Sequence, residues 1–158
     1  MSRRNTTEAL RRASISYLVD KGFSSHIELG LCRRGRLRAD VIAVNLKGTV
    51  VLLEVKSCMA DYISDSKWAK YLRYSNKMYF VFSSATYTKL KARLLLDLKN
   101  TGVGVLVLCE TSGFLKAKTP AKSRAMAVSD TTAIAVRMAW RSGESKRNTE
   151  RTPVFIGD

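Results

Sequence analysis

Two apolar, β-branched segments joined by a short polar turn constrain the fold of this chain more than any other feature. Residues 38–44 (RADVIAV) and residues 49–57 (TVVLLEVKS) flank the sequence Asn45-Leu46-Lys47-Gly48. Such segments around an Asn/Gly turn predict an antiparallel hairpin. The second segment is apolar on both faces, which is typical of a strand covered on both sides. We therefore expect a layered fold with this strand near the centre of its sheet.

The segments around the hairpin predict the other elements. Asn5 and Glu8 resemble a capping box for a first helix, and Gly22 ends its pattern. Together the elements predict an α/β fold, with a central mixed sheet flanked by helices. We expect one domain over residues 1–141 and a basic, flexible tail over residues 142–158. Helices are expected over residues 6–21, within 61–76, and over 86–99 and 123–141, and further strands over residues 26–31, 78–83, 102–108 and 114–117.

The charge balance indicates the class of partner. The 28 Lys and Arg residues outnumber the 13 Asp and Glu residues and give a net charge of +15, which attracts nucleic acid. No apolar segment is long enough to cross a membrane or to act as a secretory signal, so we expect no membrane partner. Three widely spaced cysteines and the single His26 cannot readily supply a zinc site or a catalytic triad.

Charged residues inside the apolar second segment mark the candidate site. Glu54 and Lys56 lie on one face of that strand, because side chains alternate along it. If the turn is centred on Lys47, Asp40 lies opposite Glu54, with Cβ atoms about 5 Å apart. If the turn is centred half a residue earlier, Asp40 faces Leu53 instead. The first register brings two carboxylates and a lysine together.

Two carboxylates that close need a cation between them. Mg²⁺ fits such a site, because it takes one or two carboxylates, retained waters and a substrate phosphate. The alternative is a buried ion pair in which Glu54 and Lys56 neutralise each other and no metal binds. The position of Asp40 across the hairpin and the basic character of the chain favour the metal site.

Asp40 followed by Glu54-Val55-Lys56 resembles the motif of the PD-(D/E)XK nuclease superfamily, with Ala39 in place of the usual Pro. The longer text RADVIAVNLKGTVVLLEVKS, ADYISDSKWAKYLRYSNKMYFVFS and TGVGVLVL resembles the MmcB family of bacterial DNA-repair proteins. This resemblance covers roughly residues 26–118 and leaves the arginine-rich ends outside it.

The resemblance implies a restriction-endonuclease-like αβββαβ core and a divalent-metal-dependent DNA nuclease of repair, recombination or replication. Asp40, Glu54 and the main-chain carbonyl of Val55 would bind Mg²⁺ or Mn²⁺. Lys56 would hold the attacking water or offset the charge of the phosphorane. The alternative is a DNA-binding accessory protein on the same fold that does not cut. The resemblance also implies the cytoplasm of a bacterial or phage-infected cell, with DNA as partner and a homodimer or a repair or replication protein as further partners.

Further acidic residues complete the candidate site. Glu28 on the first expected strand is the candidate for an additional metal ligand, and Glu8, better explained as a helix cap, is its rival. Asp61 is expected to support the site without binding the metal directly. Asp65 is expected to cap a helix that starts near Ser66.

Basic and aromatic residues near the site predict the path of DNA. Arg33, Arg34, Arg36, Arg38 and Lys67 are the DNA-binding candidates, the alternative being a solvated surface. The basic residues within 137–151 are expected to add a non-specific grip on DNA. Trp68 and Tyr71 are expected in the core rather than as platforms for base stacking.

Overall fold

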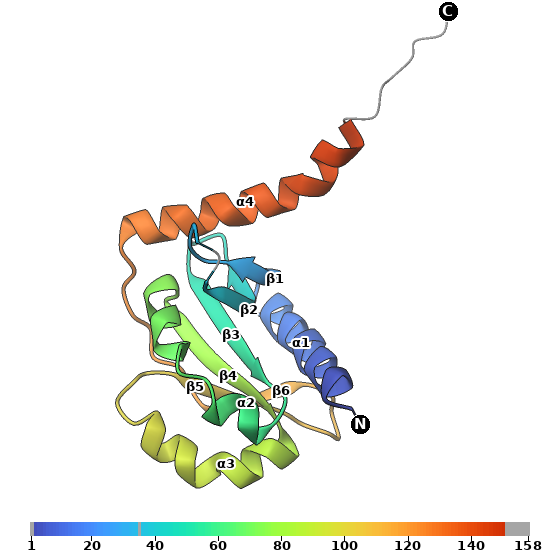
Figure 1. Cartoon of the computed structure of the whole chain (residues 1–158), viewed down its shortest axis with the longest axis vertical. Helices are drawn as coiled ribbons and strands as arrows, with labels where there is room; N and C mark the ends of the chain where they lie inside the picture. Colours follow the sequence, from blue (N-terminus) through green and yellow to red (C-terminus); the bar gives the residue numbers. More distant parts are fainter. Residues whose placement is uncertain (1, 35, 151–158) are drawn as a thin grey trace, which may run out of the picture.

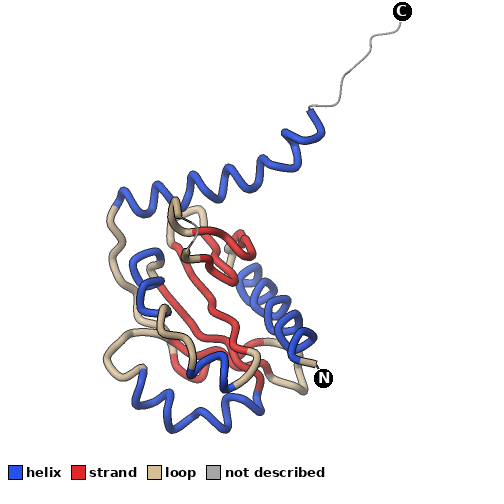
Figure 2. Tube along the Cα trace, in the orientation of Figure 1, coloured by secondary structure: helices blue, strands red, loops and turns tan. Residues whose placement is uncertain are grey.

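A six-stranded sheet with its strands in chain order organises the described part of the molecule (Figures 1 and 2). The computed structural model describes residues 2–34 and 36–150, and only the backbone of residues 145–150. The strands are β1 (Ser24–Gly30), β2 (Arg38–Val44), β3 (Val50–Lys56), β4 (Lys77–Ser83), β5 (Gly104–Leu108) and β6 (Leu115–Thr119). The helices are α1 (Arg3–Asp20), α2 (Met59–Ile63), the 3₁₀ helix η1 (Trp68–Tyr74), α3 (Ser84–Asp97) and α4 (Val128–Glu150).

The sheet is mixed, and β3 is one of its inner strands. Strands β1, β2 and β3 form an antiparallel meander, β3, β4 and β5 run parallel, and β6 is antiparallel to β5. Parallel neighbours need long crossovers, which α2 with η1 and then α3 provide. Every residue of β3 is buried, as its two-sided apolar sequence predicts. The expected α/β class is confirmed, and the arrangement is consistent with a restriction-endonuclease-like fold.

The two faces of the sheet carry separate apolar layers. Helix α1 packs its Leu10 and Leu18 against one face, which includes Leu53 of β3. Helices α2, η1, α3 and α4 cover the other face, which includes Leu52 of β3 and Phe80 of β4 (Figure 1). Because successive strand residues point to opposite faces, both layers are built from the same strands. Glu54 and Lys56 share the face of Leu52.

The β2–β3 hairpin has the register centred on Lys47. Val44 pairs with Val50 and Val41 pairs with Leu53. The side chain of Asn45 accepts hydrogen bonds from the N–H groups of Lys47 and Thr49, and Gly48 takes the left-handed conformation that the turn needs. Continued by one pair, this register sets Asp40 opposite Glu54. The alternative register, with Asp40 opposite Leu53, is wrong.

The ends of the chain differ from the sequence-based expectations. Ser2, rather than Asn5, caps α1 by accepting a hydrogen bond from the N–H of Asn5, so the helix begins at Arg3. Helix α4 continues through Ser142 to Glu150, where a flexible tail was expected. The helix continues past Gly143, the sequence of residues 144–150 contains no further Gly or Pro, and the end of the helix projects beyond the sheet (Figure 1). Residues 151–158 of the expected tail lie outside the described residues.

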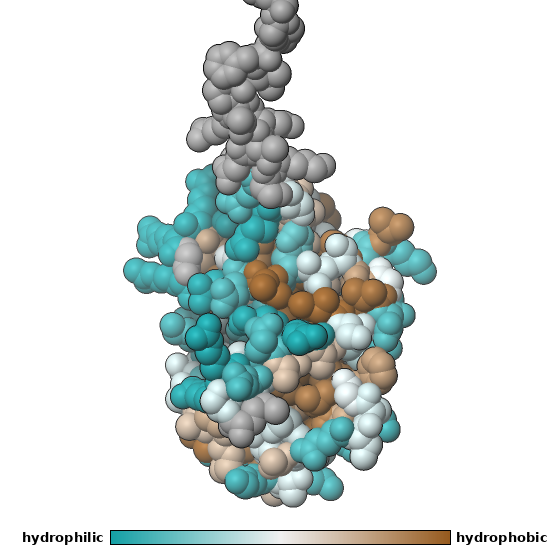
Figure 3. Space-filling view, turned by 90° about the vertical axis from the view of Figure 1, so that its right-hand side faces the viewer, coloured by the Kyte–Doolittle hydropathy of each residue, from teal (hydrophilic) through white to brown (hydrophobic). Residues whose placement is uncertain are grey.

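Exposed apolar side chains interrupt an otherwise hydrophilic surface. Figure 3, which views the molecule from the side of α1, shows hydrophilic residues over most of the face and apolar residues in a band across its middle. Exposed large apolar residues on other elements include Leu46, Phe114 and Trp140. Within the described residues, no helix combines the length and the apolar character that crossing a membrane requires.

We predict that Gly104→Ala destabilises the fold. A Cβ atom at this position would lie 2.6 Å from the backbone nitrogen of Ala121 and would also collide with the ring of Tyr79, which is buried. Forcing extra volume into a packed site typically costs about 1–3 kcal/mol. Urea denaturation should therefore show a lower free energy of unfolding.

Gly30→Ala is the matched control for this substitution. A Cβ atom at Gly30 would meet nothing within 4 Å, so its stability should stay close to that of the wild type. Equal stability of Gly104→Ala and the wild type would contradict the tight packing of β5 against Tyr79.

Candidate functional site

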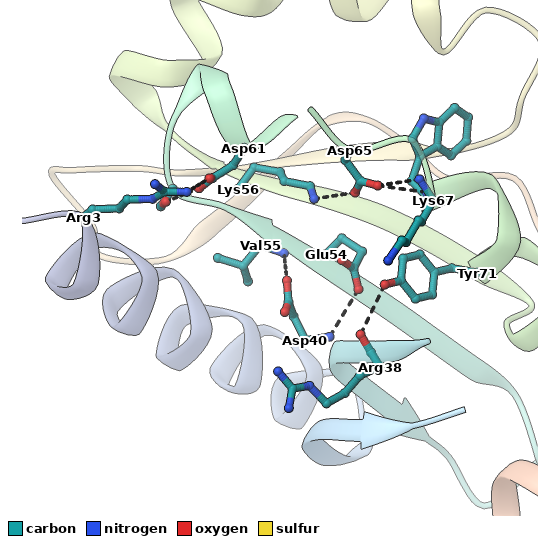
Figure 4. A network of polar contacts seen from close by, with 12 residues as sticks. Arg3, Arg38, Asp40, Glu54, Val55, Lys56, Asp61, Asp65, Lys67 and Tyr71 are labelled. Atoms are coloured by element: carbon teal, nitrogen blue, oxygen red, sulfur yellow. Dashed lines mark hydrogen bonds and ion pairs between the residues drawn. The ribbon is translucent and has the colours of Figure 1, made fainter. Parts of the chain in front are cut away.

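Asp40 and Glu54 meet where the β2–β3 ladder ends. The N–H of Asp40 donates to Oε1 of Glu54 at 3.2 Å, and the N–H of Val55 donates to Oδ2 of Asp40 at 2.8 Å (Figure 4). The regular pairing of β2 with β3 ends at Val41 and Leu53. Beyond it, the N–H groups of Asp40 and Val55 donate to carboxylates and not to main-chain carbonyls of a neighbouring strand. The hairpin brings the two acids into direct proximity, as its register predicts.

Each carboxylate keeps one oxygen for a further ligand. Oδ1 of Asp40 and Oε2 of Glu54 accept no hydrogen bond from the described residues. Both oxygens are accessible to solvent. Among the described residues, the only side-chain N or O atom that is buried and lacks a hydrogen-bond partner is Nε of Arg11, so these two oxygens, which also lack a partner, are not buried. Both acids line an open pocket together with Val55 and Lys56. The pocket thus contains two carboxylate oxygens that are available to a cation that prefers oxygen ligands.

The electrostatics of the pair are unfavourable without such a cation. Burial raises the pKa of Glu54 from its ordinary value of 4.5 to about 8, and the charge of Asp40 adds to this rise. Burial also raises the pKa of Asp40, against the opposing effects of the Val55 N–H and of Lys56. A bound cation favours the charged form of both acids. The site is therefore suited to a group that brings positive charge.

Lys56 is paired with an acid that lies outside the hairpin. Its Nζ lies 2.5 Å from Oδ2 of Asp65, and both side chains are largely buried. The other oxygen of Asp65 accepts hydrogen bonds from the N–H groups of Lys67 and Trp68 at the start of η1. Asp65 thus binds the main chain just before η1, but this helix begins at Trp68 with Lys67 as its N-cap and not near Ser66, so the expected cap differs from the observed one. The ion pair of Asp65 with Lys56 is a second contact that the sequence did not reveal.

Asp61 connects the site to the N-terminal helix. Its carboxylate accepts a hydrogen bond from the hydroxyl of Ser57 and forms an ion pair with Arg3 of α1 (Figure 4). Asp61 also lines the pocket of Asp40 and Glu54. It therefore fixes the segment that follows β3 rather than facing the two acids directly.

Trp68 and Tyr71 belong to the core, as expected. Trp68 packs edge-to-face on Phe80, with ring centroids 5.8 Å apart. Tyr71 is buried, and its hydroxyl donates to the carbonyl of Arg38 at 3.3 Å. Burial, together with the nearby carboxylate of Glu54, raises the pKa of Tyr71. Tyr71 also reaches the pocket and ties η1 to the start of β2.

Glu28, the expected additional ligand, faces a different partner. Its Oε1 lies 3.3 Å from Nη2 of Arg11, and Arg11 also approaches Glu8 at 3.8 Å. Glu28 has a φ of 51°, and the β1–β2 pairing skips it opposite Asp40. No group of three or more His, Cys, Asp or Glu side chains suited to a metal occurs within residues 2–34 and 36–144. The structure thus brings Asp40 and Glu54 together and leaves Glu28 beside them.

The DNA-binding candidates divide between two surfaces. Arg36, Arg38 and Lys67 line the pocket of the two acids. Arg33 lines a separate groove beside α4, and Arg34 is exposed and lines neither the pocket nor the groove.

The spacing of Arg11 from Glu8 on one turn of α1 was the only sequence signal for the Arg11 contacts. No local sequence pattern indicated the ion pair between Arg3 and Asp61.

Comparisons with known proteins agree with this arrangement. A family model described as DNA repair protein MmcB-like matches residues 1–142, including α1 and much of α4. A solved structure of a protein of unknown function from Silicibacter pomeroyi is 23% identical, with a TM-score of 0.72 over 96% of this chain and 97% of that chain. At that identity, the likeness establishes the fold alone. No curated protein sequence matches the chain.

The raised pKa of Glu54 predicts a pH-dependent stability. Because this pKa is about 8 in the folded protein and 4.5 ordinarily, the contribution of Glu54 is fully present below pH 4.5 and is lost as pH rises through 8. Glu54→Gln keeps an acceptor for the Asp40 N–H and does not titrate. Its free energy of unfolding in EDTA should match that of the wild type near pH 4.5 and exceed it by on the order of 2–4 kcal/mol above pH 8.

Asp20→Asn, which removes an exposed carboxylate at the end of α1, controls for the loss of one negative charge. Urea denaturation at a series of pH values measures all three proteins. A constant difference between Glu54→Gln and the wild type across this range would contradict the raised pKa.

Proposed function

This chain belongs to the MmcB-like family of DNA repair proteins, and we propose that it acts as a divalent-metal-dependent nuclease that hydrolyses DNA phosphodiester bonds. Family membership indicates the role in DNA repair. The proposed activity rests on one observation, the contact of the Asp40 main-chain N–H with the Glu54 carboxylate, next to the Asp40 carboxylate that the Val55 N–H binds, at the open end of the β2–β3 hairpin. Together with Lys56, this contact supports placing the chain in the PD-(D/E)XK superfamily.

The donor set fits Mg²⁺ or Mn²⁺. Hard cations prefer oxygen ligands, and Mg²⁺ binds through one or two carboxylates while keeping several waters. Asp40 and Glu54 each have an oxygen available, and the main-chain carbonyl of Val55 is the third proposed ligand. When bound, such a cation lowers the pKa of a water ligand and polarises a phosphate oxygen. The raised pKa values of the two acids support a site that becomes fully charged only with the cation.

Lys56 is the proposed catalytic cation of the chain itself. It shares a strand face with Glu54 and lines the same pocket, so its ammonium group faces the space where a phosphate would lie. Its proposed role is to orient the attacking water or to offset negative charge that develops on the phosphate. Asp65 holds the ammonium group in place through the ion pair and is therefore a positioning residue.

Arg36, Arg38 and Lys67 are the proposed DNA contacts around the pocket. All three are exposed, and each lines the pocket that holds the two acids. Arg and Lys side chains bind phosphate oxygens and fix the register of DNA without reading its sequence. They would hold a phosphodiester over Asp40 and Glu54.

A DNA-binding accessory protein that does not cut is the second candidate. Two ion pairs favour it, because they engage residues that a nuclease would use at its site: Lys56 pairs with Asp65, and Glu28 pairs with Arg11. The accessible oxygens of Asp40 and Glu54 favour the nuclease, because a protein that only binds DNA gains nothing from a half-buried Asp40 beside a buried Glu54 that repel each other when charged.

We predict that Asp40→Asn and Glu54→Gln each abolish cleavage and leave DNA binding intact. Both carboxylates serve the cation, whereas exposed basic residues supply the affinity for DNA. Labelled single-stranded, duplex, flap and forked DNA should be incubated with Mg²⁺, Mn²⁺ or EDTA, and binding should be measured in EDTA. Asp20→Asn should cleave like the wild type. Cleavage at the wild-type rate by either site variant would refute this assignment.

Lys56 and Asp65 yield a separate prediction. Lys56→Ala should lower the cleavage rate by about 10²–10³-fold, the usual cost of removing one group that stabilises charge in the transition state. Its affinity for Mn²⁺, measured by calorimetry, should stay the same or rise, because a nearby positive charge is removed. Asp65→Asn keeps an oxygen to bind the main chain just before η1 but removes the charge that holds Lys56, so it should lower the rate less than Lys56→Ala does. Loss of Mn²⁺ binding in Lys56→Ala would mean that Lys56 shapes the metal site instead.

A further inference from the structure

Helix α4 and the end of β1 enclose a groove that presents an indole to solvent. Leu29, Gly30 and Arg33 line one side of this groove, and the α4 residues Val136, Arg137 and Trp140 line the other. The side chains of Val136 and Trp140 are 61% and 62% exposed. The lining of the groove thus combines apolar side chains with arginines.

The helix that carries Trp140 is fixed to the fold. Ile134 and Met138 are buried in the same core layer as Leu29 and Tyr71. The guanidinium group of Arg141 donates to the carbonyl of Glu28 at 3.1 Å. At the other end of α4, Arg73 and Asp130 form an ion pair at 3.0 Å. Trp140 therefore projects from a held helix, as a rigid recognition surface requires.

The charge around the groove favours a polyanion. Neither Arg33 nor Arg137 forms an ion pair with any residue in the described part of the chain, and no Asp or Glu side chain lines the groove. Arg141 is partly neutralised by Glu144 at 3.7 Å. A second copy of this chain, with its own net charge of +15, would bring like charge to this surface. A negatively charged partner is the better match.

The groove is a separate surface that lies near the pocket of the two acids. Arg33 lines the groove, while Arg36, three residues further along the chain, and Arg38 at the start of β2 line the pocket. Consecutive Cα atoms are 3.8 Å apart, so the Cα atoms of Arg33 and Arg36 lie within about 11 Å of each other. Leu29 beside the groove and Tyr71 beside the pocket belong to one apolar layer, so both surfaces lie on the same side of the sheet. A few nucleotides could connect them.

We propose that this groove binds single-stranded DNA, with an unpaired base stacked on Trp140 and flanking phosphates on Arg33 and Arg137. Stacking on an exposed aromatic side chain requires a base whose face is free, which a single strand offers and an intact duplex does not. The base stacks against the indole, and the apolar side chains of Leu29 and Val136 support its edge. The part of the proposal that leads the strand onward to Asp40 and Glu54 rests on the proposed nuclease function.

Binding of the full-length protein to a short fluorescein-labelled oligo(dT), measured by anisotropy in EDTA, tests the groove without any cleavage. Stacking contributes about 1–3 kcal/mol per base, so Trp140→Ala should weaken oligo(dT) binding by about 5- to 150-fold. Trp140→Phe, which keeps a stacking ring, should retain most of the affinity. Binding to a duplex of equal length should change by less than about twofold.

Phe114→Ala is the matched control, because Phe114 is 56% exposed and lies beside β6, at the opposite edge of the sheet from β1. It should bind oligo(dT) like the wild type. An unchanged affinity of Trp140→Ala for oligo(dT), or an equal loss on duplex, would overturn the proposal. Self-association in the absence of DNA that Trp140→Ala abolishes would assign the groove to a second copy and would also overturn it.

A second measurement covers the case in which Trp140→Ala does not fold. In a Trp68→Phe background, Trp140 is the only tryptophan, and oligo(dT) should quench its fluorescence at the concentrations at which anisotropy reports binding. Unchanged fluorescence on binding would overturn the stacking. Failure of the nuclease is distinguishable: a protein that binds oligo(dT) through Trp140 and never cuts refutes only the nuclease proposal, and the reverse result refutes only the groove.

Discussion

The register of the β2–β3 hairpin is the constraint on which the candidate site depends. Side chains alternate along a strand, so a slip of one residue would move every side chain of β3 to the other face. Leu53 must reach the layer under α1 and Leu52 the layer under the other helices, which fixes β3 in place. The same register sets Asp40 beside Glu54. The apolar packing that stabilises the sheet thereby offsets the repulsion between the two carboxylates.

The partner of Lys56 determines what kind of site results. A lysine between Asp40 and Glu54 would neutralise them internally and leave a structural ion pair. Here the ammonium group lies on Asp65, and the pKa values of both hairpin acids are raised. The proposed cation would supply the positive charge that lets both acids ionise together, and in that respect the site differs from a Glu54–Lys56 ion pair whose members neutralise each other.

Sequence reasoning predicted what local patterns encode. The turn at Asn45 and Gly48 and the two-residue alternation predicted the hairpin and the position of β3 in the sheet, and they left two registers open, of which the structure has the one centred on Lys47. The contacts between Lys56 and Asp65 and between Arg11 and Glu28 join separate elements, and periodicity carries no information about such pairs. The region 61–76 forms two short helices, and between them the side chain of Asp65 accepts hydrogen bonds from the N–H groups of Lys67 and Trp68. The extent of α4 was missed because its polar residues fit a helix and a loose tail equally well.

Glu28 shows how segments without any motif shape the site. A non-glycine residue in the left-handed region is uncommon, and it persists where its surroundings hold it. The side chain of Glu28 is held by Arg11 of α1, and its carbonyl is held by Arg141 of α4. Its conformation interrupts the β1–β2 pairing opposite Asp40. Asp40 is thus released from the regular ladders on both sides, so its N–H and its carboxylate can engage Glu54 and Val55. The first and last described helices therefore hold Glu28 next to the acidic pair, although neither contributes a carboxylate to that pair.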